Sequence, residues 1–157
     1  MLLQVQNLTL SYGEITVLKN LTFTVKKGQI LCILGESGCG KTSLLKAARG
    51  FMDRDTGEIY FQGERVFNKS EKLVPGTKGI AIVHQDFQLE PGYTVYDNIR
   101  HHLIQYQKSY QESKTEEIIN LCRLQSIRNK TSKELSGGQK QKVALAKAII
   151  EEPPLLL

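Results

Sequence analysis

Long apolar runs are missing from this sequence, and none approaches the roughly 20 residues that a membrane-spanning helix needs. The N-terminus also lacks a basic leader, because it alternates apolar and polar residues from Leu3 to Gln6. It therefore does not resemble a secretory signal peptide. From these absences we expect that any work at a membrane depends on a partner protein.

Cysteine is scarce as well. The three cysteines, Cys32, Cys39 and Cys122, form no C-x-x-C pair and no spacing typical of a metal site. An odd count without a leader is typical of a protein in a reducing, cytosolic compartment. Because Cys32 and Cys122 have apolar neighbours, we expect both of them to lie in the core.

Positive charge is in modest excess but is not concentrated in one segment of the sequence. The formal net charge is +5, yet no run of five or six basic residues occurs. Such an excess is compatible with a polyanionic partner or with scattered charges on a solvated surface, and the even spread favours the second interpretation. The chain has 157 residues, of which 40% are hydrophobic and 24% charged, as expected of one globular domain with a core.

The beginning of the chain has the pattern of strands followed by a helix. Alternation of apolar and polar residues predicts half-buried strands at residues 3–10 and 17–25. A continuous apolar run at residues 29–34 predicts a strand that is buried on both faces. Good helix formers at residues 42–49 predict a helix, and Gly50 is expected to end it.

The second half has a more helical pattern. Residues 58–61 and 80–83 are predicted as strands, after which the sequence from Thr94 to Cys122 becomes helical and more polar. A last helix is expected to begin near Ser136, with one buried stripe made of the apolar residues Val143, Ala144, Ala146, Ile149 and Ile150. Pro153 and Pro154 should end it, and the three leucines that follow are expected to begin another buried strand.

The most specific motif is the segment Gly35-Glu36-Ser37-Gly38-Cys39-Gly40-Lys41-Thr42, which matches G-x-x-x-x-G-K-[ST]. Its glycines let successive backbone N–H groups face one concavity, and the following helix adds its positive end, so the loop can bind phosphate. Lys41 supplies a charge for the β- and γ-phosphates, and the Thr42 hydroxyl can ligate Mg²⁺. A chance glycine-rich turn is disfavoured because a predicted buried strand precedes the loop and a helix follows it. For Cys39, a small residue that fits the loop is favoured over a redox switch.

A second motif is Leu135-Ser136-Gly137-Gly138-Gln139. Ser136 and Gln139 form an S-x-x-Q capping box, and the glycines leave bare N–H groups at a helix start. This is a second geometry that can bind an anion. Taken alone, the motif is equally well explained as a simple helix cap.

Together the two motifs resemble the ABC (ATP-binding cassette) ATPases. Residues 35–42 resemble the Walker A motif, and residues 135–139 resemble the LSGGQ signature that separates this family from other P-loop proteins. Gln85 falls at the position of the Q-loop glutamine, and Tyr12 resembles the A-loop aromatic residue that stacks on adenine. The resemblance covers residues 2–157.

The resemblance implies an α/β fold: a P-loop NTPase core with an N-terminal antiparallel β subdomain, an inserted helical subdomain and the C-terminal core strands missing. It implies one incomplete ATP-binding domain, 1–157, with a β and P-loop portion at 1–93, the helical subdomain with its signature helix at 94–150 and the start of the Walker B strand at 151–157.

The implied ligands are ATP and Mg²⁺. The nucleotide-binding residues carried over by position are Tyr12, Gly35, Ser37, Gly38, Cys39, Gly40, Lys41, Thr42, Ser43, Gln85, Ser136, Gly137, Gly138 and Gln139. Thr42 and Gln85 would hold the metal ion, and Gln85 would also position the attacking water. In this family two cassettes pair head-to-tail, so Ser136 and Gly138 would contact the γ-phosphate of ATP bound by a second subunit.

Two departures from the family pattern affect these expectations. Lys142 and Lys147 stand where the signature helix usually has Arg, which keeps the charge but loses planar bidentate hydrogen bonding, so we expect a tuning effect. The Walker B Asp, the catalytic Glu and the switch histidine are absent, and His84, His101 and His102 all precede the signature. We therefore expect a truncated chain that hydrolyses ATP very slowly.

The favoured function is that of a transporter's ATPase subunit at the cytoplasmic face of the membrane, bound to transmembrane permease subunits. Residues 85–99 resemble the corresponding segment of bacterial importers. An alternative is a soluble ABC ATPase that acts on nucleic acid or ribosomes, although no long insertion, zinc-type cysteine set or coiled-coil heptad supports it, and no nucleic-acid partner is expected. A third interpretation is a non-catalytic nucleotide sensor.

Overall fold

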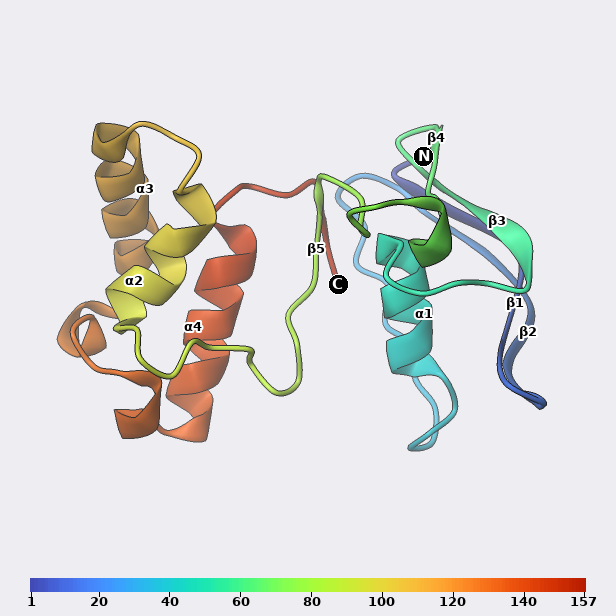
Figure 1. Cartoon of the computed structure of the whole chain (residues 1–157), viewed down its shortest axis with the longest axis horizontal. Helices are drawn as coiled ribbons and strands as arrows, with labels where there is room; N and C mark the ends of the chain where they lie inside the picture. Colours follow the sequence, from blue (N-terminus) through green and yellow to red (C-terminus); the bar gives the residue numbers. More distant parts are fainter. The chain divides into compact units, whose positions relative to one another are not determined.

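The computed structural model describes residues 1–157, which divide into unit 1 (Met1–Ile80) and unit 2 (Ala81–Leu157) (Figure 1). Unit 1 contains a four-stranded sheet with the strand order β2-β1-β3-β4, and every neighbouring pair in it is antiparallel. Its strands are β1 (Leu3–Tyr12), β2 (Ile15–Val25), β3 (Thr56–Phe61) and β4 (Glu64–Arg65). The predicted N-terminal antiparallel subdomain is therefore confirmed.

The alternation in β1 gives this strand one buried face. Leu3, Val5, Leu8 and Leu10 are buried and face the core of unit 1, while the residues between them are more exposed. Burial of a leucine or valine side chain stabilises a fold by about 1.5–3 kcal/mol, so this face contributes strongly to the stability of unit 1.

Helix α1 (Lys41–Arg49) follows the phosphate-loop segment and buries Leu44, Ala47 and Ala48. It ends as predicted at Gly50, which is left-handed with φ 81°. The Gly50 amide donates to the Ala47 carbonyl at 2.9 Å, and the Phe51 amide donates to the Lys46 carbonyl at 2.8 Å. These two bonds satisfy carbonyls in the last turn of the helix. A short 3₁₀ helix, η1 (Lys69–Glu71), comes later in unit 1.

The strand predicted at residues 29–34 is wrong. The segment forms no strand, and Figure 1 shows it as a coil between β2 and α1. The exposed fraction is 96% for Ile30 and 87% for Leu34. A strand needs a neighbour for its N–H and C=O groups, and no strand of this chain pairs with the segment. Cys32 is consequently exposed and not in the core as predicted.

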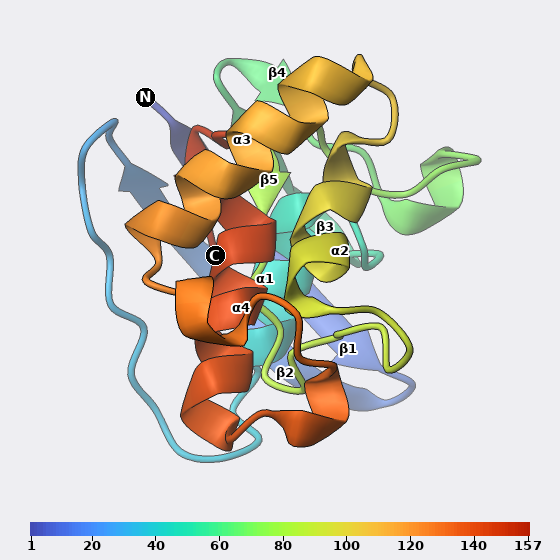
Figure 2. The same ribbon diagram turned by 90° about the vertical axis from the view of Figure 1, so that its left-hand side faces the viewer.

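Unit 2 is mainly helical (Figure 2). Its α-helices are α2 (Val95–Arg100), α3 (Lys108–Leu121) and α4 (Gly137–Ile149), and α2 contacts both of the others. Three 3₁₀ helices, η2 (His101–Leu103), η3 (Gln125–Ile127) and η4 (Ser132–Glu134), complete it. None of the helices in the chain is long and apolar enough to cross a bilayer.

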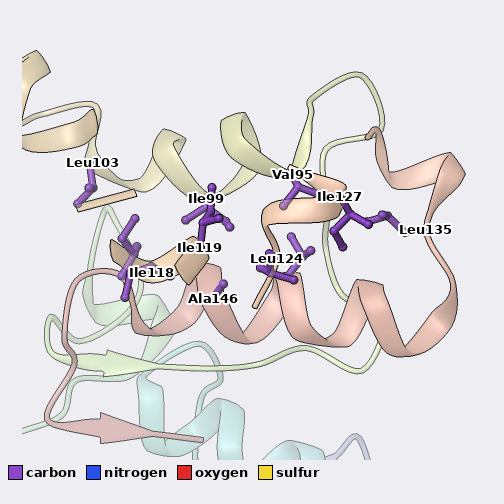
Figure 3. Close-up of a cluster of buried hydrophobic side chains, with 11 residues drawn as sticks. Val95, Ile99, Leu103, Ile118, Ile119, Leu124, Ile127, Leu135 and Ala146 are labelled. Atoms are coloured by element: carbon purple, nitrogen blue, oxygen red, sulfur yellow. The ribbon is translucent and has the colours of Figure 1, made fainter. Parts of the chain in front are cut away.

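The core of unit 2 lies between these helices (Figure 3). Its buried side chains are Val95, Ile99, Leu103, Ile118, Ile119, Leu124, Ile127, Leu135, Val143, Ala146 and Ile150. Of the predicted apolar stripe of the last helix, Val143, Ala146 and Ile150 lie in this cluster and Ile149 packs against it, while Ala144 is buried outside it. Cys122, predicted to be a core residue, packs against the cluster and is partly buried, which raises the pKa of its thiol.

A second, two-stranded sheet pairs β5 (Ile80–Ala81) with β6 (Leu155–Leu156). Within unit 2, the Leu157 amide donates to the Ala81 carbonyl and the Val83 amide donates to the Leu157 carbonyl, both at 2.9 Å. The strands predicted near residues 80 and 155 are therefore present, although both are short.

Candidate functional site

The loop before α1 leaves backbone donors free at the start of the helix. Gly40 is the N-cap residue, and because it has no side chain, no side-chain group accepts from the first-turn N–H groups. The first turn also contains no acidic residue. Unsatisfied N–H groups and the positive end of the helix dipole together form a site that suits an anion.

Glycine is required at two positions of this loop. Gly38 and Gly40 have φ of +85° and +95°, a left-handed conformation that side chains disfavour. A Cβ at Gly40 would lie 2.9 Å from Leu18 Cδ2 and 3.0 Å from the Val17 carbonyl oxygen, whereas one at Gly38 would meet nothing within 4 Å. The loop thus rests on β2 at Gly40 and is open at Gly38.

Lys41 folds back over the same loop. Its Nζ donates to the carbonyl oxygens of Gly35 at 2.8 Å and Glu36 at 2.6 Å, and lies 3.6 Å from Cys39 Sγ. A Cβ at Gly35 would lie 2.6 Å from Cys39 Sγ, so the thiol occupies the space beside Gly35.

Tyr12 lies beside the start of α1, at the end of β1. Its hydroxyl is 3.1 Å from Ser43 Oγ and 3.5 Å from Met52 Sδ. Ser43 is buried, while Tyr12 is half exposed. The hydroxyl contact ties the aromatic side chain to the helix that begins at Lys41.

The signature segment begins α4 with the predicted capping box. Ser136 Oγ accepts from the Gln139 amide at 3.3 Å, and the Gln139 side chain accepts from the Ser136 amide at 2.9 Å. Gly137 and Gly138 follow in exposed positions. A second capping box, Thr131 with Glu134, precedes it in η4. The T-x-x-E spacing could have identified that box from the sequence.

The loop after Gln85 has an unusual backbone. Gln85 is exposed, and Phe87 and Gln88 have positive φ of 62° and 44°. The Gln88 carbonyl accepts a hydrogen bond from Lys147 Nζ of α4 at 2.5 Å. Sequence reasoning identified Lys147 as a departure from the family pattern, but it had no signal for this contact.

Asn98 is a further residue that sequence reasoning missed. Its side chain is 2% exposed, and its amide nitrogen donates to the carbonyls of Glu90, Tyr93 and Thr94 at 3.1–3.2 Å. Its oxygen accepts from the Glu90 amide at 2.8 Å. This buried amide, with all its polar groups paired, fixes the end of the loop that follows Gln85. An Asn in a short helix has no sequence pattern that would predict such a role.

The predicted site residues divide between the two units. Unit 1 brings together Tyr12, the phosphate loop and the start of α1, and unit 2 carries Gln85 and residues 136–139. No group of three or more His, Cys, Asp or Glu side chains is arranged to hold a metal ion.

The comparison with protein families decides the assignment, because the family model described as ABC transporter matches residues 18–157. The chain belongs to the ABC transporter family. One relative in this family is the spermidine/putrescine import ATP-binding protein PotA of Thermotoga maritima. The two are 36% identical over 155 residues, which are 98% of this chain and 41% of PotA. The chain thus spans less than half the length of this ABC relative.

Solved structures of ABC proteins have the same fold. The dimeric ATP-binding cassette MJ0796 bound to ADP and Pi matches with a TM-score of 0.84 and 27% identity, over 99% of this chain and 72% of that one. The ATP-binding subunit of an ABC transporter matches with the same TM-score and 26% identity, over 99% of this chain and 65% of that one. The predicted α/β fold of ABC-ATPase type is confirmed.

Proposed function

We propose that this chain is the nucleotide-binding part of an ABC transporter ATPase subunit, which couples ATP binding and hydrolysis to solute import. The observation that carries the proposal is the phosphate loop of unit 1. There the glycines, the uncapped start of α1 and the Lys41 ammonium converge on one place. Each of these three features favours a polyphosphate.

ATP is the proposed ligand because the surroundings of the loop suit the whole nucleotide. Backbone N–H groups of residues 38–43 and Lys41 Nζ would bind the phosphates, and Lys41 would exchange its present carbonyl partners for phosphate oxygens. The exposed ring of Tyr12 would stack on adenine. Thr42 is exposed at the start of α1, where its hydroxyl could ligate Mg²⁺ together with the phosphates.

The remaining predicted residues belong to the same proposal. Gln85 would contribute an amide oxygen to Mg²⁺ and hold the attacking water. Ser136 and Gly138 would meet the γ-phosphate of ATP bound by a second cassette. None of the proposed site residues is a carboxylate or a histidine, the side chains that most often act as a general base. We therefore propose that the chain alone binds ATP and hydrolyses it very slowly.

The proposed partners are a second ABC cassette and transmembrane permease subunits, at the cytoplasmic face of the membrane. The dimeric cassette MJ0796 supports the first partner. The name of the relative PotA, a polyamine import protein, supports the second. Unit 2 also carries a surface cavity of about 500 Å³ that a permease segment could enter, lined by Tyr93, Asp97, Arg100, His101, Ile104 and Gln111.

The test is a titration of the 157-residue chain with a fluorescent ATP analogue in the presence of Mg²⁺. Lys41→Ala should abolish saturable binding, because it removes the charge that faces the phosphates. Lys46→Ala is the matched control, because it removes the same charge from the last turn of the same helix. Binding that is equal in all three proteins would contradict the proposal.

A further inference from the structure

The loop that carries Gln85 needs an external support. Phe87 and Gln88 both have positive φ, and this left-handed conformation is disfavoured for residues that have a Cβ. The local hydrogen bonds are few: the Phe87 amide donates to His84 at 3.0 Å and the Gln88 amide donates to Asp86 at 2.8 Å. Two consecutive residues persist in such a conformation only where surrounding groups hold them.

The support comes from two sides of unit 2. At the end of the loop, the buried Asn98 binds the backbone of Glu90 in both directions. In the middle of the loop, Lys147 Nζ donates to the Gln88 carbonyl at 2.5 Å. This bond is the contact that reaches one of the two left-handed residues directly from another element.

The environment of Lys147 shows that its position is specific. Lys147 is half-buried on α4, whereas Lys142 on the same helix is exposed. Burial lowers the pKa of Lys147, and the nearby Glu90 carboxylate opposes this effect. Because removing an amine from water is unfavourable, the side chain stays there only with a partner for its N–H groups, and the Gln88 carbonyl is that partner.

We propose that Lys147 is a positioning residue: it holds Phe87 and Gln88 in their left-handed conformation and thereby fixes where Gln85 presents its side chain. The same helix, α4, begins at the signature residue Gly137. Lys147 follows Gly137 by ten residues, a distance of about 15 Å along the helix axis. One rigid helix therefore carries the signature motif at one end and the support of the Gln85 loop near the other. The part played by Gln85 itself rests on the proposed function.

The first experiment tests the support without any nucleotide. Amide hydrogen exchange is measured by NMR for Phe87, Gln88 and Glu90 in the wild-type chain and in Lys147→Met, which keeps an unbranched side chain but removes the donor. We expect exchange at these three amides to accelerate about tenfold or more, as fits the loss of one hydrogen bond from a charged donor. Amides of the unit 2 core should stay unchanged, which shows that the fold is intact.

Two further variants make the result specific. Lys147→Arg retains a donor of similar length and should keep exchange close to the wild-type rate, although its planar fork differs from an ammonium. Lys142→Met removes an exposed charge from the same helix and should have no effect on the loop. Unchanged exchange in Lys147→Met, or equal acceleration in Lys142→Met, would overturn the positioning role.

The second experiment connects the support to the site. The affinity for the fluorescent ATP analogue is measured with and without Mg²⁺. Lys147→Met and Gln85→Ala should each remove most of the gain that Mg²⁺ provides. The double variant should lose no more than Gln85→Ala alone, because both changes act through one side chain. Fully additive losses would refute the link between Lys147 and Gln85.

The two experiments fail in different ways. If the wild-type chain binds no nucleotide, the proposed function fails, while hydrogen exchange still decides whether Lys147 supports the loop. If nucleotide binds and depends on Lys41, but Lys147→Met changes neither exchange nor the Mg²⁺ gain, the proposed function stands and the positioning role of Lys147 is refuted.

Discussion

Substituting Gly40 by alanine tests how tightly the phosphate loop is seated on the sheet of unit 1. Two costs add at this position. The backbone has φ +95°, and holding a residue with a Cβ in a left-handed conformation costs about 1–2 kcal/mol. The new methyl group would also lie 2.9 Å from Leu18 Cδ2 and 3.0 Å from the Val17 carbonyl, and such overpacking costs about 1–3 kcal/mol.

Together these costs predict that Gly40→Ala destabilises unit 1 by about 2–5 kcal/mol, a large part of the roughly 5–15 kcal/mol that a domain has. Gly38→Ala is the matched control in the same loop. Its φ is +85° and its methyl group meets nothing within 4 Å, so it should cost only about 1–2 kcal/mol. The difference between the two variants isolates the contact with β2.

The assay is urea unfolding, followed by the NMR signals of the β1–β2 pair, which report on unit 1. Gly40→Ala should cost less in the Leu18→Ala background than in the wild type, because Leu18 Cδ2 at 2.9 Å is then absent while the Val17 carbonyl remains. If Gly40→Ala costs no more than Gly38→Ala, the loop does not rest on β2 as described.

Three other changes have defined outcomes, each read from urea unfolding midpoints. Asn98→Ala should destabilise unit 2 by about 3 kcal/mol, because it removes a buried side chain together with its hydrogen bonds to the backbone of Glu90 and Tyr93. Ser136→Ala should cost about 1 kcal/mol through loss of the α4 cap. Hydrogen bonds from Arg65 and Arg54 hold the pKa of Glu58 below its ordinary 4.5. The stability from Glu58 is therefore present above pH 4.5 and is lost as pH falls through the lowered pKa, and Glu58→Gln should flatten this decline.

Local patterns in the sequence predicted much of the fold. The alternation in β1, the stop at Gly50 and the capping box at Ser136 depend on neighbours within a few residues, so the sequence contains the whole cause. The phosphate loop belongs to this class only in part: Lys41 binds the nearby carbonyls of Gly35 and Glu36, whereas Gly40 lies against β2, far away in the sequence. The roles of these residues toward ATP remain predictions.

Long-range partners explain what could not be predicted. Residues 29–34 have the composition of a buried strand, but a strand also depends on a neighbour, and composition does not say whether one is present. Lys147 reaches a carbonyl 59 positions away, and no spacing rule connects the two. The role of Asn98 could not be predicted either, because it depends on hydrogen bonds to the loop backbone at Glu90.

The exposed apolar segment at residues 29–34 has a consequence for how this chain behaves in solution. No strand of this chain pairs with it, and the side chains of Ile30 and Leu34 expose apolar surface. Unpaired apolar segments of this length are templates for intermolecular β-pairing. The thiol of Cys32 lies in the same stretch and is exposed, so contact between two molecules can be made permanent by oxidation. We therefore expect association that rises steeply with protein concentration and becomes partly irreversible without a reductant.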